Sequence, residues 1–113
     1  MAEETPDPLA RVCARFAPGW EAYVSVGAGW DSIVLDLDRA LAEVAPGCRY
    51  QQIKEKWGEL RVHLAVGNGA AETLIREAEL RAAHTCEDCG SEGSMQVSPR
   101  GWHGVLCPEC VRS

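Results

Sequence analysis

Apolar residues recur at helical spacing in the segment GWDSIVLDLDRALAEVAPG. The recurring positions form one stripe, and they are Trp30, Ile33, Val34, Leu37, Leu41 and Val44. Asp31 suits the start of a helix, and Pro46-Gly47 would stop it. The pattern predicts an amphipathic helix in which Asp31, Asp36 and Asp38 lie on a solvated face.

Two further segments have the same period. One is a short run at Leu9, Val12, Cys13 and Phe16 that Pro18-Gly19 would end, and the other is AAETLIREAELRAAH, where acids precede arginines by four residues. Both are predicted to be helices. The stretch from Trp20 to Gly29 contains glycines and has no clear period, so we expect a loop or a short turn of helix there.

The period changes to two in ELRVHLAV. Leu60, Val62, Leu64 and Val66 alternate with Arg61, His63 and Ala65, which is typical of a half-buried strand. The preceding YQQIKEKW is more polar, and the glycine of Lys-Trp-Gly-Glu allows a tight connection. The two runs predict a β-hairpin with one apolar and one charged face.

Four cysteines near the end of the chain form two Cys-x-x-Cys pairs. Cys86 and Cys89 are separated from Cys107 and Cys110 by seventeen residues, enough for a β-hairpin. Structural zinc takes four tetrahedral ligands and favours thiolate, and each Cys-x-x-Cys turn brings two sulfurs to one side of a tight loop. The spacing predicts one structural zinc ion held by these four cysteines in a zinc-ribbon or treble-clef hairpin.

Other uses of the cysteines are less consistent with the pattern. Disulfides need an oxidising compartment, and a redox pair needs only one Cys-x-x-Cys in a βαβ setting. An iron–sulfur cluster is chemically open to four thiolates, although the paired spacing favours zinc. His84 and His103 are spare ligand candidates, better suited to neighbouring positions. Cys13 and Cys48 are expected to be small buried apolar residues, with a reactive thiol as the alternative.

The chain of 113 residues is 46% hydrophobic, which suits a single small α+β domain with a metal-supported appendage. We expect an acidic tail at residues 1–7, an α+β domain at 8–84 (helix, helix, β-hairpin, helix) and the four-cysteine zinc-binding hairpin at 85–113. No apolar run is long enough to span a membrane, and MAEETPDPLARV lacks the features of a secretion signal. These features predict a cytoplasmic protein.

Charge is unevenly distributed. The formal net charge is −6, which disfavours general nucleic-acid binding. The segment 49–63 instead carries four basic and two acidic side chains and contains both lysines of the chain. A basic hairpin in an acidic protein is a candidate docking surface.

Four segments together resemble a known family: GWDSI, QIKEKWGELR, CEDCG and GWHGVLCPEC. The family consists of small bacterial and phage zinc-ribbon-like proteins, mostly without assigned function, and the resemblance covers about residues 29–110. Trp57 stands where the family more often has phenylalanine, and other members use histidine in place of Cys110. The resemblance implies a cytoplasmic prokaryotic or phage setting, and it implies functional interest in a set of hairpin residues: Gln52, Lys54, Glu55, Lys56, Gly58 and Arg61.

The sequence therefore favours a zinc-stabilised interaction protein. Its expected partner-binding residues are Gln52, Lys54, Lys56, Trp57, Arg61 and His63. The expected partner is a protein; any contact with nucleic acid would be local and weak. The alternative is an acidic inhibitor or immunity-type protein acting against a toxin or nucleic-acid enzyme. An enzyme is less favoured because no catalytic constellation stands out; one built from Glu55, Glu59, Arg61 or His63 would more simply be cross-strand ion pairs.

Overall fold

The computed structural model describes residues 8–111, so the acidic tail predicted at 1–7 and the last two residues of the predicted hairpin 85–113 lie outside the described residues. The described chain is an α+β fold with two sheets. Its elements are α1 (Ala10–Cys13), β1 (Val24–Ser25), the 3-10 helix η1 (Ala28–Trp30), α2 (Asp31–Val44), β2 (Arg49–Lys56), β3 (Glu59–Val66), α3 (Gly69–Ala82), β4 (Ser94–Val97), β5 (His103–Leu106) and α4 (Pro108–Val111).

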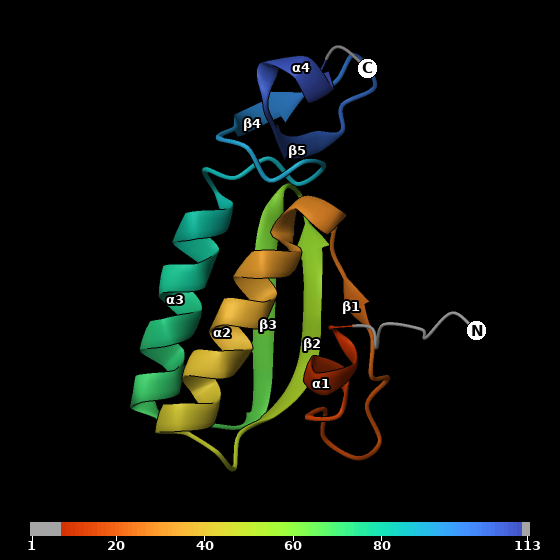
Figure 1. Cartoon of the computed structure of the whole chain (residues 1–113). Coiled ribbons are helices and arrows are strands. Elements are labelled where there is room, and N and C mark those ends of the chain that lie inside the picture. Colours follow the sequence, from red (N-terminus) through yellow and green to blue (C-terminus); the bar gives the residue numbers. More distant parts are fainter. Residues whose placement is uncertain (1–7, 112–113) are drawn as a thin grey trace, which may run out of the picture.

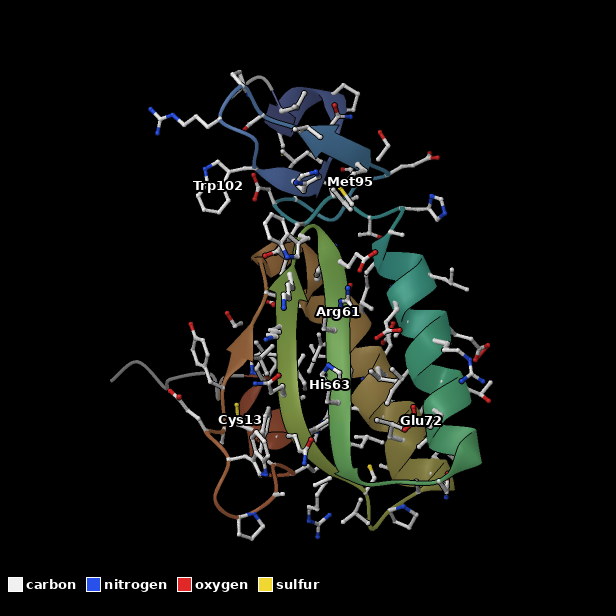
Figure 2. The ribbon with its side chains drawn as sticks, turned by 180° about the vertical axis from the view of Figure 1, so that it is seen from behind. Cys13, Arg61, His63, Glu72, Met95 and Trp102 are labelled. Atoms are coloured by element: carbon white, nitrogen blue, oxygen red, sulfur yellow. The ribbon has the colours of Figure 1, made fainter. Side chains whose placement is uncertain are left out.

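The main sheet has the order β1-β2-β3, and α2 and α3 lie side by side across one of its faces (Figure 1). Ile53, Leu60 and Val62 are buried on that face, as the alternation in the sequence predicts. Within the described residues, no helix covers the opposite face, which Figure 2 shows from behind. The main domain therefore has two layers and one open sheet face.

The two long helices confirm the predictions made from their apolar periods. Ile33, Val34, Leu37 and Leu41 of α2 are buried, whereas Val44 at its end is exposed, contrary to the predicted stripe. The helix α3 begins after Asn68, whose side-chain oxygen accepts a hydrogen bond of 2.9 Å from the backbone N–H of Ala71.

The prediction of a loop or a short turn of helix between Trp20 and Gly29 agrees with η1 but missed the strand β1. The two-residue strand β1 pairs in parallel with β2, placing Val24 beside Ile53, and η1 leads directly into α2. Strand β1 is specified by its neighbour rather than by a period of its own, so no local pattern indicates it. The first helix is also shorter than expected, because it ends at Cys13 and Phe16 instead forms a β-bridge with Tyr50.

Asp38 does not lie on a solvated face, which corrects the prediction for that residue. It is 1% exposed, and its Oδ1 accepts a 2.7 Å hydrogen bond from the hydroxyl of the fully buried Tyr50. Arg11 and Arg15 lie 3.6 Å from its carboxylate oxygens. Asp36 is exposed as predicted and forms an ion pair of 2.8 Å with Arg81 of α3. A buried charge is stable only with such partners, and they come from separate segments.

The second sheet consists of β4 and β5 and stands at one end of the main domain, next to the tip of the β2–β3 hairpin (Figure 1). Val105 of β5 is fully buried and belongs to the main apolar core. The side chain of Met95 packs against Gly58, where an added Cβ would lie 2.6 Å from its sulfur. The four-cysteine segment is therefore packed directly on the domain.

Candidate functional site

The four cysteines of the two Cys-x-x-Cys pairs come together in space. Cys86 and Cys89 lie in the turn that follows α3, while Cys107 immediately precedes α4 and Cys110 lies within it. Their ligand atoms all lie within 4.8 Å of one another. In the part of the chain that the structure describes, no histidine or carboxylate joins this group, so His84 and His103 lie outside it. The arrangement could hold one metal ion.

Backbone hydrogen bonds shape the first cysteine turn. Gly90 has a φ of 85° and donates its N–H to the carbonyl oxygen of Cys86 at 2.9 Å. A positive φ favours glycine, which explains the glycine after the second cysteine. In the second pair, the N–H of Cys110 donates to Sγ of Cys107 at 3.4 Å. Such N–H to sulfur contacts stabilise a thiolate.

The thiols of the first pair are shifted toward the ionised form. Hydrogen bonds with Ser91 lower the pKa of Cys89 to about 6, and the bond with the side chain of Ser91 contributes more than the bond with its backbone. Burial raises the pKa of Cys86, but hydrogen bonds to the backbone N–H groups of Cys89, Cys107 and Asp88 outweigh burial, so its pKa is below its usual range. The thiolate is the form that binds metal, so these two positions are suited to it.

A set of hydrogen bonds fastens the first cysteine turn to the start of α2. The carbonyl oxygen of Glu87 accepts from the N–H of Gly29 at 2.7 Å, and its carboxylate accepts from the N–H of Gly27 at 2.9 Å. Indole Nε1 of the fully buried Trp30 donates to the carbonyl oxygen of Thr85 at 2.8 Å. Burial raises the pKa of Glu87, although the bond from Gly27 acts in the opposite direction.

Sequence reasoning missed this contact. The only signal was the pair of glycines before Trp30, because glycines two apart allow close approach of another backbone. The metal-binding candidates and the entry to α2 are thus joined by residues of the stretch for which the sequence predicts a loop or a short turn of helix.

The predicted partner-binding residues lie on the open face of the main sheet and at its tip. Gln52 faces His63 across the β2–β3 ladder, and Lys54 faces Arg61. Lys56 ends β2, and Figure 2 shows Arg61 and His63 projecting from the open face. The hairpin thus brings all of these side chains to one surface, which we call the basic face: Gln52, Lys54, Lys56, Arg61 and His63.

Charges on the basic face are incompletely balanced. Lys54 and Arg61 stand directly opposite each other, an arrangement of like charges that is unfavourable in a sheet. Arg61 forms an ion pair with Glu59, whereas Lys54 and Lys56 form none with any side chain that the structure describes. The lysines therefore present net positive charge to solvent.

Trp57 occupies an unusual position at the tip of the hairpin. Its φ is 56° and that of Gly58 is 81°, so the two form a turn of type I′. The indole is 65% exposed, and it packs edge-on against the imidazole of His103 with ring centroids 5.8 Å apart. A bulky residue at positive φ is strained, and such strain is concentrated at functional positions.

Two aromatic residues beside the basic face escaped the sequence analysis. Trp20 and Tyr23 are exposed and line a shallow pocket of about 160 Å³ together with Gln52 and Lys54. They precede and flank β1, so their proximity to the hairpin depends on the parallel pairing of β1 with β2. Their type alone gave no indication of a site.

Comparisons of the chain with protein-family models, with curated proteins and with solved structures found no match. The likeness to a family of zinc-ribbon-like proteins therefore rests on its motifs alone. The described helices include none with the length and apolar character that crossing a membrane requires.

Proposed function

We propose that Cys86, Cys89, Cys107 and Cys110 hold one structural zinc ion. The observation that supports this is the convergence of four thiol sulfurs within 4.8 Å, the donor set that zinc prefers. Four protein thiolates complete a tetrahedral shell and leave no position for water, so the ion would stabilise the fold rather than catalyse. Zinc–thiolate chemistry requires reduced cysteines, in keeping with the proposed cytoplasmic location.

Native mass spectrometry tests the zinc proposal. We expect one zinc ion per chain, lost in the variant Cys107→Ser and retained in Cys48→Ser, whose thiol is buried outside the cluster. Full zinc content in Cys107→Ser, or a different metal in the purified protein, would contradict the proposal.

We further propose that the protein is an interaction module that docks an acidic protein partner on the basic face. The observation that carries this proposal is an uncovered sheet face on which Lys54 opposes Arg61, with no acid pairing either lysine among the described residues. An unfavourable charge arrangement is relieved when a partner supplies carboxylates. The exposed Trp57 adds an aromatic side chain of the kind enriched at binding hot spots.

A protein partner is better supported than a nucleic acid. The net charge of the chain is −6, so a long polyanion would meet repulsion outside the hairpin. A carboxylate-bearing segment of limited length contacts the basic face alone. Any contact with nucleic acid would be local and weak.

Capture of the partner from the native host tests the docking proposal. We expect a stoichiometric protein to bind the wild type in the presence of nuclease, and to be lost with Lys54→Glu/Lys56→Glu. A matched control is Arg39→Glu/Arg100→Glu, which changes the charge equally at two exposed arginines away from the basic face. Undiminished capture by the lysine variant would overturn the proposal.

A further inference from the structure

One leucine of helix α3 lies outside the protein core. The buried residues of this helix are Ala71, Ile75, Ala78 and Ala82, which form the stripe that packs on the domain. Leu80 lies off that stripe and is 67% exposed. A single exposed leucine is common on soluble proteins, so its meaning depends on the side chains around it.

Leu80 lines a groove of about 410 Å³ between the C-terminal half of α3 and the start of β3. Met95, which is 45% exposed, lines the same groove. Figure 2 shows Met95 between the four-cysteine segment and the tip of the hairpin β2–β3. Ala83 adds a third exposed apolar side chain. Apolar side chains gathered in a concave surface are typical of a contact surface for another molecule.

The charged side chains of the groove are two glutamates and two arginines, so their charges sum to zero. Glu59 and Arg61 form an ion pair with each other. Among the described side chains, the guanidinium of Arg76 donates a hydrogen bond to the hydroxyl of Thr73 and forms no ion pair, and the carboxylate of Glu79 also forms none. The groove thus has one cation and one anion that lack an ion-pair partner within the chain.

This charge pattern is complementary to itself. Two copies related by a two-fold axis present the same patch to each other, so every contact across the axis occurs twice. Arg76 and Glu79 lie on the same side of α3 as Leu80, because residues three and four apart are neighbours on a helix. If the α3 helices of two copies cross in opposite directions, Arg76 of each copy meets Glu79 of the other.

The charge of the whole chain also favours contact at this groove. A net charge of −6 makes two copies repel each other over most of their surfaces. The groove is neutral, so the repulsion is weakest there. An acidic or a basic partner would leave one of the two unpaired groups, Arg76 or Glu79, facing a like charge, whereas a second copy pairs both.

We propose that two copies of this chain associate through the groove as a symmetric dimer. Leu80 of each copy would enter the groove of the other, and Arg76 and Glu79 would form two reciprocal ion pairs across the axis. Lys54 and Lys56 lie outside the groove, so the dimer leaves both lysines accessible. The inference is independent of the proposed docking function, since it uses other side chains.

Analytical ultracentrifugation of the full chain tests the dimer. We expect a dimer whose population rises with concentration. Leu80→Lys should weaken it by about tenfold or more, because a charge replaces a buried leucine on both sides of the interface. Val97→Lys is the matched control, since Val97 is also exposed but lies outside the groove. A monomer at all concentrations up to about 1 mM, or equal effects of the two variants, would overturn the proposal.

A charge exchange between copies tests the symmetric arrangement. Arg76→Glu and Glu79→Arg should each weaken the homodimer, because like charges then face each other twice. When the two variants are mixed at low salt, where exposed charges are least screened, both ion pairs form again. Native mass spectrometry should then show the heterodimer in excess over either homodimer. An ion pair within one helix cannot produce this preference. A mixture without excess heterodimer would show that the symmetric contact is wrong.

Discussion

Gly29 marks the closest approach between the cysteine turn and the main domain. A Cβ added there would clash with the carbonyl oxygen of Cys86 and lie 2.6 Å from that of Glu87. These are backbone atoms, which cannot move aside like the end of a flexible side chain. We therefore expect Gly29→Ala to lower the free energy of unfolding by about 1–3 kcal/mol, as overpacking does. Urea denaturation would measure the change.

A matched glycine provides the control. Gly47 has no atom within 4 Å of an added Cβ, so Gly47→Ala should leave the free energy of unfolding within about 0.5 kcal/mol of wild type. Equal effects of the two substitutions would show that close packing at Gly29 is not the cause.

Tyr50 links stability to alkaline pH. Burial, followed by its hydrogen bond to Asp38, raises the pKa of Tyr50 above its ordinary value of 10.0. Above about pH 10 the unfolded chain therefore loses this proton while the folded chain keeps it, so folding stability declines as the pH rises. Tyr50→Phe should remove this part of the decline between pH 9 and 11. Chemical denaturation across that range measures the difference in slope.

The same substitution has a cost at neutral pH. Without the hydroxyl, the buried carboxylate of Asp38 loses a 2.7 Å hydrogen bond, which should destabilise the fold by about 1–3 kcal/mol. A variant with wild-type stability at pH 7 and an unchanged alkaline slope would refute the importance of this pair.

At the scale of elements, a substitution in the turn Trp57-Gly58 distinguishes a role in folding from the proposed role in binding. A type I′ turn prefers asparagine at its first central position, so Trp57→Asn relieves backbone strain while it removes the ring contact with His103. We expect the free energy of unfolding to change by no more than about 1 kcal/mol, because the two effects oppose each other. Partner capture should fall severalfold. A large loss of stability would instead identify Trp57 as a structural residue.

The elements that the sequence predicted correctly are those with their own periodic signal. These elements are α2, the hairpin β2–β3 and α3. In each of them, apolar residues recur at helical or alternating spacing along the element. The four candidate metal ligands could also be predicted from the sequence, because the Cys-x-x-Cys spacing is a local signal. Their convergence within 4.8 Å agrees with that prediction.

The features that were missed depend on partners distant in the sequence. Asp38 has the spacing of a solvated residue, and only Tyr50 and the two arginines near it make its burial possible. Strand β1 is two residues long and is fixed by its parallel neighbour. The groove beside β3 requires the relative placement of β3, α3 and Met95, which no local pattern encodes.

At the scale of the whole molecule, the four-cysteine segment has little apolar material of its own. Its apolar residues Val97 and Trp102 are exposed. Among the described residues of this segment, Val105 alone belongs to the main apolar core. Figure 2 shows Trp102 projecting into solvent at this end of the molecule. A segment with so little burial requires another source of stability, which the proposed structural zinc would supply.

The attachment of this segment also positions the tip of the basic face. Met95 packs on Gly58, His103 contacts Trp57, and Glu87 holds the entry to α2. Loss of the metal should therefore affect residues far from the cysteines in sequence. We propose that this coupling makes the metal site a support of the proposed binding surface.

Hydrogen exchange with and without zinc tests this claim most directly. After chelation, confirmed by native mass, we predict that residues 85–111 lose protection and that the N–H groups of Gly27 and Gly29, which bond Glu87, lose it with them. The amides of α2 should remain protected, since none of the four metal-ligand candidates belongs to the core on which it packs. Unchanged protection at Gly27 and Gly29 after complete zinc removal would contradict the account.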